Sequence, residues 1–315
     1  MKSEKLYIII ILVFLLSIFK NLSFAEMKKD LIIFSGAFFS PVFHAIKNES
    51  ETALSVNLLA EFSGSQAAFR KLTELKRECD IIVSADNTLF KKMAPDYFSW
   101  RIDFAGDEMV LGIGIRAKKT DEAERNFIPV LMDKNNVLGR TDENLSPIGY
   151  RTLLVWKLLE ERGYQGLTGR LKTKSEKVME DVEHLSALLK SGDVDYGFVY
   201  KTTCVEQDIR FISLDKKINL GDEEADYSRA EVSFGAKLKG EEKSISVKGA
   251  PIVYSLSIPS NSLNKEKSIE WITFLLKSNN RILSEHGFTV FMPKFYGNKD
   301  DFVKFKDYCK YAGGF

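Results

Sequence analysis

The chain has 315 residues, of which 44% are hydrophobic and 12% aromatic, and its formal net charge is +1. Such a composition can bury a sizeable core, and the near-neutral charge argues against a general binder of nucleic acid or of an anionic membrane surface. The length predicts one large domain or two lobes. Cys79, Cys204 and Cys309 are odd in number and widely spaced. They match no metal-binding spacing, so we expect three buried thiols.

The first 25 residues have the pattern of a secretory signal peptide. Lys2 and Lys5 precede the apolar run 6–19, and Ser23-Phe24-Ala25 places small residues before a cleavage site. The run is short for a membrane span, although an uncleaved N-terminal anchor is the alternative. We therefore expect an exported protein whose mature chain begins after residue 25.

Short apolar runs then alternate with helical stretches. Strands are predicted at residues 30–34, 54–59 and 80–83, followed by helices that end near residue 50 and span 66–76 and 88–93. This alternation predicts a parallel, doubly wound sheet. In such sheets ligands lie beyond the carboxyl ends of the strands, where Ser35, Ser65 and Asp86 are expected. Asp86 is expected to cap the next helix, because its charge would repel an anion.

Two further apolar runs, 108–115 and 251–258, are predicted as strands that cross between two lobes. The expected division is residues 26–108 plus 256–315 for the first lobe and 109–255 for the second. The remaining predicted elements are a helix at 178–189, a strand at 195–199, an excursion or small hairpin within 215–249, and helices at 265–277 and 280–286. Two lobes with two crossings form a hinge and a cleft, which suits ligand capture by closure. The fold alone does not decide function.

The stretch 139–151 joins a strand-like entry to a helix with an apolar side at 152–161. Ser146 is suited to the N-cap and Pro147 to the first helical position. The amides of Ile148 and Gly149 then point out of the helix start, which is a site for a small anion. The alternative is that this Ser-Pro pair merely caps a surface helix.

The same stretch holds two arginines. We expect Arg140 and Arg151 to pair with Asp142 or Glu143 rather than with a ligand.

Several motifs together resemble the tungstate- and molybdate-binding proteins that serve ABC importers, especially their archaeal-type branch. The matching stretches are residues 64–75, 79–86, 107–111, 139–158, 195–200, 218–222 and 249–254. The resemblance covers nearly the whole mature chain. It implies an α/β fold, the two-lobed periplasmic binding protein of type II, with doubly wound mixed sheets, a hinge and an interlobe cleft.

The resemblance also implies where a ligand would bind, and the chain departs from the family there. In the archaeal-type branch two carboxylates reach the metal of the oxyanion, at the positions held here by Ser146 and Val199. The first loop usually carries a serine where this chain has Phe38, whose amide can still donate. Residues 197–202 resemble a loop of the bacterial molybdate binders, which hold a tetrahedral oxyanion by hydrogen bonds alone, and Tyr200 could supply the hydroxyl donor. We therefore expect a tetrahedral site without metal ligation.

A tetrahedral dianion offers only acceptors, so its site needs N–H and O–H donors. The candidate ligand-binding residues are Ser35, Phe38, Ser65, Ser146, Ile148, Val199 and Tyr200. Four of them have a structural alternative. Ser65 could cap a helix, Tyr200 could pack between the lobes, and the Phe38 ring could wall the site or fill it. Ser35 could be tolerated beside a Gly-Ala turn without a function.

Enzyme activity is not expected. His44, His184 and His286 lie on separate helical stretches, and the sequence has neither a nucleophile elbow nor a phosphate-binding glycine loop. No cofactor and no metal are expected. The predicted function is a monomeric solute-binding protein, in the periplasm or at the outer face of the cytoplasmic membrane, that delivers tungstate or molybdate to an ABC importer permease. The alternatives are a binder of sulfate, phosphate or another tetrahedral oxyanion, a partner-binding or sensory descendant with an altered cleft, and an enzyme on the same scaffold.

Overall fold

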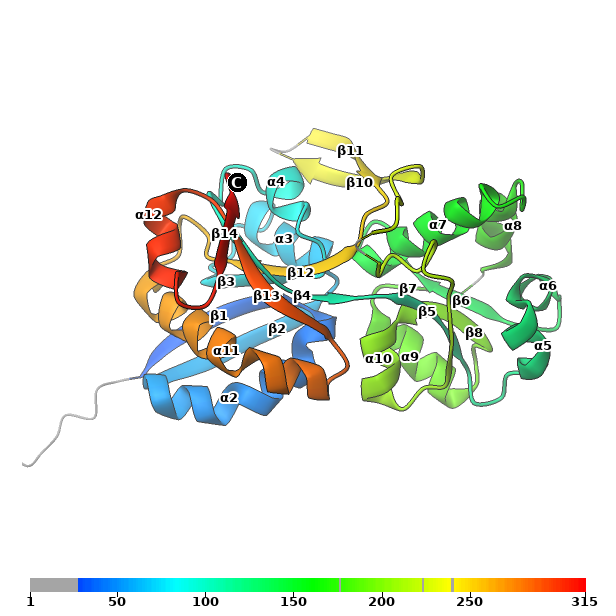
Figure 1. Ribbon diagram of the computed structural model, residues 1–315, viewed down its shortest axis with the longest axis horizontal. Helices are drawn as coiled ribbons and strands as arrows, with labels where there is room; N and C mark the ends of the chain where they lie inside the picture. Colours follow the sequence, from blue (N-terminus) through cyan, green and yellow to red (C-terminus); the bar gives the residue numbers. More distant parts are fainter. Residues whose placement is uncertain (1–27, 176, 223, 239–240) are drawn as a thin grey trace, which may run out of the picture.

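The computed structural model (Figure 1) describes residues 28–315 except 176, 223 and 239–240. The predicted signal segment, residues 1–25, lies outside these described residues. Across the described part of the chain, no helix combines the length and the apolar character that a membrane crossing needs.

The larger lobe, residues 28–107 and 252–315, is built on a seven-stranded sheet of order β14-β13-β4-β12-β3-β1-β2. Its strands are β1 (Lys29–Gly36), β2 (Val56–Ser63), β3 (Ile81–Ser84), β4 (Arg101–Asp107), β12 (Ile252–Ser257), β13 (Thr289–Tyr296) and β14 (Lys310–Gly313). The three strands β1, β2 and β3 are parallel, as predicted, and β12 runs antiparallel to β3 and β4. The sheet is therefore mixed.

Helices cover both faces of this sheet. They are η1 (Ala37–Phe39), α2 (Ser40–Leu54), α3 (Ser65–Thr73), α4 (Leu89–Met93), α11 (Lys265–Glu285), α12 (Lys299–Phe302) and η2 (Val303–Phe305). Figure 1 shows α2 and α11 side by side on one face, with α3 and α4 on the other. The two helices predicted at 265–277 and 280–286 are instead one continuous helix, α11.

The smaller lobe, residues 109–213, contains a five-stranded sheet of order β7-β6-β8-β5-β9. Its elements are β5 (Met109–Ile113), α5 (Thr120–Arg125), α6 (Phe127–Met132), β6 (Leu138–Thr141), α7 (Pro147–Glu160), α8 (Leu167–Lys174), β7 (Lys177–Met179), α9 (Val182–Ser191), β8 (Tyr196–Tyr200), α10 (Lys201–Gln207) and β9 (Phe211–Ser213). The helix α7 is buried along almost its whole length, from Pro147 to Leu159. It is thus a central helix rather than the surface helix of the alternative reading.

Two segments join the lobes. The chain passes from β4 to β5 across Asp107 and Glu108, and it returns through residues 214–251. The predicted division placed residues 252–255 in the second lobe, but β12 pairs with β4 from Ile252 onward. The return crossing therefore ends at Ile252, and these four residues belong to the larger lobe.

The return segment contains a hairpin, β10 (Glu231–Leu238) and β11 (Glu241–Lys248), which lies across the top of both lobes in Figure 1. From the larger lobe, Arg70 donates to the carbonyl of Gly235 (2.7 Å). From the smaller lobe, Asn144 accepts from the amide of Gly235 (2.9 Å), and the ring of Tyr150 stacks on Phe234 at 5.2 Å. The excursion predicted within 215–249 is thus a hairpin that contacts both lobes and covers α7.

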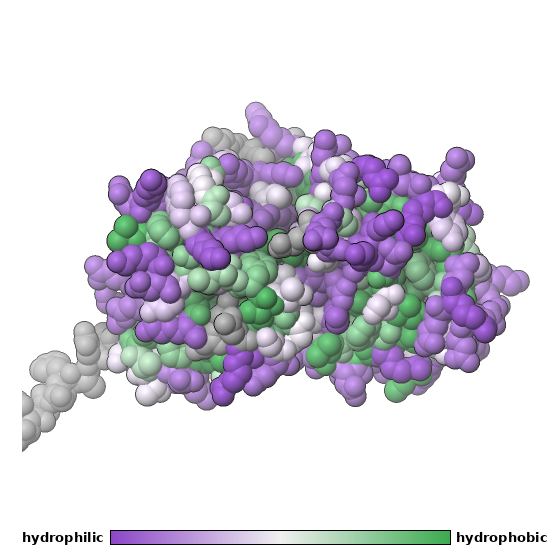
Figure 2. Space-filling view, in the orientation of Figure 1, coloured by the Kyte–Doolittle hydropathy of each residue, from purple (hydrophilic) through white to green (hydrophobic). Residues whose placement is uncertain are grey.

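The face shown in Figure 2 is largely hydrophilic, with hydrophobic residues in separate patches on both lobes. All three cysteines are free and buried, which confirms the prediction of three buried thiols. Burial raises the pKa of Cys79 and of Cys309 to about 12.

Candidate functional site

A small cavity lies between the lobes, at the point where five of the described helices begin. These are η1 and α3 of the larger lobe and α7, α9 and α10 of the smaller lobe. The lining residues are Gly36, Ala37, Phe38, Ser63, Gly64, Ser65, Ala85, Ser146, Pro147, Ile148, Asp181, Val182 and Tyr200. The first amides of a helix have no partner within it, and the helix dipole is positive there. The amides of Lys201 and Thr202 in α10 and of His184 in α9 already have carbonyl or carboxylate partners, so the helix starts that favour a negative charge are mainly those of η1, α3 and α7.

The cavity is narrow in this structure. The space open to the centre of a water molecule is about 10 Å³, which is roughly the volume for one water. An oxyanion of five heavy atoms is larger, so the walls must separate slightly to admit it.

Five of the seven predicted ligand-binding residues line this cavity: Phe38, Ser65, Ser146, Ile148 and Tyr200. The other two predicted residues lie outside its lining. The Ser35 hydroxyl donates to the carbonyl of Gly36 (2.9 Å), and Val199 is fully buried inside β8. Both side chains are buried in the core, so we do not include Ser35 and Val199 in the proposed ligand-binding set.

Ser65 is buried at the first residue of α3, while Gly64 holds the N-cap position. Its hydroxyl oxygen accepts from the amide of Ala85 at 3.0 Å. Ser65 is therefore not the helix cap of the alternative reading, and its own hydroxyl hydrogen is free to donate.

Ser146 holds the N-cap position of α7, and Pro147 is the first helical residue, as predicted. The Ser146 side chain makes no capping hydrogen bond with the described residues. Ser146, at the N-cap, and Ile148, in the first turn, both line the cavity.

Tyr200 ends β8 and precedes α10. Its hydroxyl oxygen accepts from Nη1 of Arg151 at 2.7 Å. Burial raises the pKa of Tyr200 to about 12, so the hydroxyl keeps its proton at neutral pH and can donate it.

The Phe38 ring forms a wall of the cavity. It stacks on the ring of Tyr254 with 4.0 Å between centroids and 15° between planes. A Cβ on Gly36 would lie 2.5 Å from that ring, so only glycine fits beside it.

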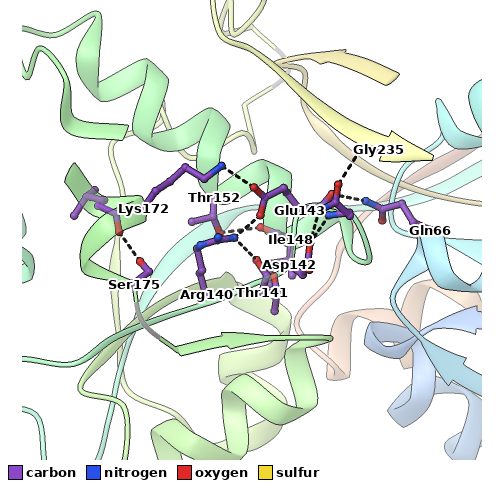
Figure 3. A network of polar contacts seen from close by, with 12 residues as sticks. Gln66, Arg140, Thr141, Asp142, Glu143, Ile148, Thr152, Lys172, Ser175 and Gly235 are labelled. Atoms are coloured by element: carbon purple, nitrogen blue, oxygen red, sulfur yellow. Dashed lines mark hydrogen bonds and ion pairs between the residues drawn. The ribbon is translucent and has the colours of Figure 1, made fainter. Parts of the chain in front are cut away.

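The two arginines of the 139–151 stretch have different partners. Arg140 pairs with Glu143, as predicted, and Lys172 reaches the same carboxylate at 2.7 Å (Figure 3). The prediction that Arg151 also pairs with Asp142 or Glu143 is wrong. Arg151 is buried and instead donates to the Ala85 carbonyl (2.6 Å) and to Tyr200, because its side chain extends across the lobe interface.

Two acidic residues complete the surroundings. Asp86 accepts from the amide of Thr88 (2.7 Å) and from the Tyr150 hydroxyl. The N-cap of α4 is Thr88, so Asp86 stabilises the turn before the helix and is not the helix cap that the sequence predicted. Asp181 lines the cavity, which the sequence analysis missed. It is the N-cap of α9, where its carboxylate accepts from the amide of His184 (3.0 Å).

The lobes touch beside the cavity. The Gln66 side chain donates to the Glu143 carbonyl across the interface at 3.1 Å (Figure 3), and the Ala67 amide donates to the Leu145 carbonyl at 3.4 Å. A Cβ on Gly64 would lie 2.1 Å from the same Leu145 oxygen. This structure therefore holds the two lobes closed on one another.

A carboxylate is also buried at the hinge. Asp107 is the last residue of β4. Its carboxylate accepts hydrogen bonds from the hydroxyls of Thr202 and Tyr254 and from the amide of Glu108 (2.7 Å). Burial raises the pKa of Asp107 to about 6, although these hydrogen bonds act to lower it.

Two α/β lobes, two crossings between them and a cavity at the lobe interface lined by helix starts are typical of a solute-binding protein. The chain belongs to the bacterial extracellular solute-binding protein family, whose sequence profile matches residues 31–289. It is 33% identical to an uncharacterized solute-binding protein of Petrotoga mobilis, over 91% of each chain. It is 29% identical to the molybdate/tungstate-binding protein WtpA of Thermococcus kodakarensis, over 90% of this chain and 85% of that one.

Among solved structures, the fold is similar to the periplasmic molybdate-binding protein of Azotobacter vinelandii. The TM-score is 0.60 at 14% identity, over 82% of this chain and 99% of that one. These comparisons confirm the predicted family resemblance and the two-lobed fold. The matched family and the relatives and solved structure named above are solute-binding or molybdate-binding proteins.

Proposed function

We propose that this protein captures tungstate or molybdate between its lobes, outside the cytoplasm, and presents it to the permease of an ABC importer. The observation that carries the proposal is the convergence of helix starts from both lobes, above all those of η1, α3 and α7, on one interlobe cavity. Two of the relatives are named molybdate/tungstate-binding proteins, which points to the same class of ligand.

The donors at the cavity suit a tetrahedral oxyanion. Ser65 and Tyr200 each have an oxygen that accepts from the protein, so each hydroxyl hydrogen is left for the ligand. Helix-start amides such as that of Ile148 add further donors. Hydrogen bonds to a charged group contribute roughly 1.5–3 kcal/mol each. Several such bonds, less the cost of association, permit micromolar to nanomolar affinity.

The site holds the anion by hydrogen bonds rather than by metal ligation. Ser146, at one of the two carboxylate positions of the archaeal-type branch, lines the cavity with a neutral hydroxyl. Val199, at the other, is an apolar residue of the core. The expected ligand geometry is therefore the tetrahedron of the free oxyanion.

The proposed cycle is a binding equilibrium. The lobes separate at the hinge, the anion enters, and its bonds to both lobes favour the closed form that the permease recognises. The protein acts as a monomer after removal of its signal peptide.

A second candidate ligand is hydrogen phosphate, and one observation favours it. Asp181 places a carboxylate residue in the cavity lining, and a carboxylate can accept the proton that hydrogen phosphate carries. Tungstate, molybdate and sulfate carry no such proton at neutral pH.

Calorimetric titration tests the proposal. Residues 26–315 are titrated with tungstate, molybdate, sulfate and phosphate at pH 7.5, beside a thermal-shift series with the same anions. Sub-micromolar binding of tungstate or molybdate, with sulfate and phosphate at least a hundredfold weaker, is the expected result. Tight binding of phosphate alone would transfer the proposal to the second candidate, and no binding of any of the four would refute it.

A further inference from the structure

Arg151 is a buried cation at the interface of the two lobes, next to the cavity. Its side chain is 5% exposed, and it lies in the second turn of α7. Its Nη1 donates to two neutral oxygens, the carbonyl of Ala85 in the larger lobe (2.6 Å) and the hydroxyl of Tyr200 in the smaller lobe (2.7 Å). The guanidinium carbon lies 5.7 Å from the centroid of the Tyr200 ring. One side chain of α7 thus bonds to both lobes at once.

The bond from Arg151 to Tyr200 determines whether the Tyr200 hydroxyl donates or accepts toward the cavity. A guanidinium group only donates hydrogen bonds, so the Tyr200 oxygen accepts from Arg151. The hydrogen of the Tyr200 hydroxyl is left for another partner, and Tyr200 lines the cavity. Arg151 therefore makes Tyr200 a donor toward a ligand in the cavity.

The bond from Arg151 to Ala85 connects Arg151 to Ser65, the cavity hydroxyl of the larger lobe. The amide of Ala85 donates to the Ser65 oxygen (3.0 Å), while the carbonyl of Ala85 accepts from Arg151 (2.6 Å). A continuous path of hydrogen bonds therefore runs from Tyr200 through Arg151 and Ala85 to Ser65. It joins the two cavity hydroxyls, one from each lobe.

The charge of Arg151 has no carboxylate among these two hydrogen-bond partners. Asp86, the residue after Ala85, interacts with it electrostatically, and Asp86 itself accepts from Tyr150. A dianion in the cavity would add negative charge next to a buried cation, where the interaction is screened less than at the surface.

We propose that Arg151 is a positioning residue that orients the Tyr200 hydroxyl as a donor to the oxyanion and, while the lobes are closed, links Tyr200 to Ser65 through Ala85. This inference rests on the proposed function and deepens it. The Arg151–Tyr200 bond lies within the smaller lobe, whereas separation of the lobes removes the bond to the Ala85 carbonyl, so the link between the two cavity hydroxyls exists only in the closed form. Arg151 itself makes no contact with the ligand.

A double-mutant cycle tests this role. Tungstate affinity is measured by calorimetry for the wild type, Arg151→Met, Tyr200→Phe and the double variant. Each single change should weaken binding about tenfold or more. Residues of one hydrogen-bond network are coupled, so the double variant should bind about three- to thirtyfold more tightly than the product of the single losses predicts. A purely structural Arg151 would leave the two losses multiplicative, and that result would overturn the inference.

Two further variants separate charge from hydrogen bonding. Arg151→Gln keeps N–H donors without the charge, and Arg151→Lys keeps the charge with one ammonium donor. We expect partial recovery from each relative to Arg151→Met, and equal losses in all three would contradict a role in orienting the hydroxyls. Circular dichroism and thermal melting establish that each variant folds. If Arg151→Met does not fold, Arg151→Lys takes its place in the cycle.

The outcomes distinguish this inference from the function on which it rests. A wild-type protein that binds none of the four anions refutes both. A wild-type protein that binds tungstate, with Arg151 and Tyr200 variants whose effects multiply, refutes the role of Arg151 and leaves the proposed function standing.

Discussion

Replacing Gly64 by alanine tests whether closure of the lobes is part of anion binding. Gly64 has φ −61° and ψ 144°, a conformation that alanine adopts without strain. The new Cβ would nevertheless lie 2.1 Å from the carbonyl oxygen of Leu145 in the other lobe. The substitution therefore opposes closure while each lobe by itself can keep its fold.

The magnitude follows from the contacts beside it. An ordinary contact begins at 3.4 Å, so the lobes must move apart by the difference from 2.1 Å, about 1.3 Å. A movement of that size takes the Gln66–Glu143 bond (3.1 Å) and the Ala67–Leu145 bond (3.4 Å) out of hydrogen-bonding range. Two bonds at about 0.5–1.5 kcal/mol each give a loss of about 1–3 kcal/mol in closure, or five- to 150-fold in anion affinity.

Calorimetry with tungstate measures the loss, and small-angle X-ray scattering with and without the anion measures closure. Gly169→Ala is the matched control, because nothing lies within 4 Å of its Cβ on α8. That control should leave affinity unchanged and stabilise the helix by roughly 0.5–1 kcal/mol. Wild-type affinity and full compaction in Gly64→Ala would show that the lobe contact at Leu145 plays no part in binding.

Three further predictions concern single side chains. Ser65→Ala should weaken oxyanion binding by about 1–3 kcal/mol in calorimetry, while Ser191→Ala, an exposed serine on α9, should not; equal affinities would remove Ser65 from the site. Asp181→Asn keeps the cap of α9 and removes a negative charge from the cavity lining, so tungstate should bind about 1 kcal/mol more tightly; weaker binding would make the carboxylate a ligand group. Burial raises the pKa of Asp107 from 3.8 to about 6, so the stability that its protonated form contributes is complete below pH 3.8 and is lost as the pH rises through 6. The unfolding free energy of Asp107→Asn relative to the wild type should therefore rise by up to about 3 kcal/mol between pH 4 and pH 7 in urea titrations, and parallel pH curves would disprove it.

The sequence predicted those parts of the fold whose signals are local. Each of the strands β1, β2 and β3 is an apolar run followed by a turn and a helix, and the order of these elements was sufficient to predict parallel pairing. The strand β4 was missed because Arg101 and Asp103 interrupt its apolar pattern. In the fold these two side chains pair with each other at 2.9 Å, which permits their burial.

The residues of the candidate site likewise separate into those with a local sequence signal and those without one. Ser146 and Ile148 were proposed from capping rules, Ser65 from its place beyond the carboxyl end of a predicted strand, and Tyr200 from a loop that resembles a known family; all four line the cavity. Arg151 was misassigned because Glu143 is near it in sequence, whereas its two partners, Ala85 and Tyr200, are 66 and 49 residues away. The position of Asp181 in the cavity likewise depends on how α9 packs beneath η1, which no local pattern in the sequence records.

Because each lobe contains at least one buried cysteine, the reactivity of these thiols can measure the unfolding of each lobe separately. Cys79 and Cys309 lie in the larger lobe and Cys204 in the smaller lobe. Thiols react as thiolates, and burial raises the pKa of all three. Each cysteine therefore becomes reactive when the part of the lobe around it opens. Mass spectrometry after a pulse of a thiol reagent can then follow the two lobes separately. A bound ligand should slow labelling by up to a factor of one plus the ratio of free ligand concentration to Kd, because it lowers the population of the open form.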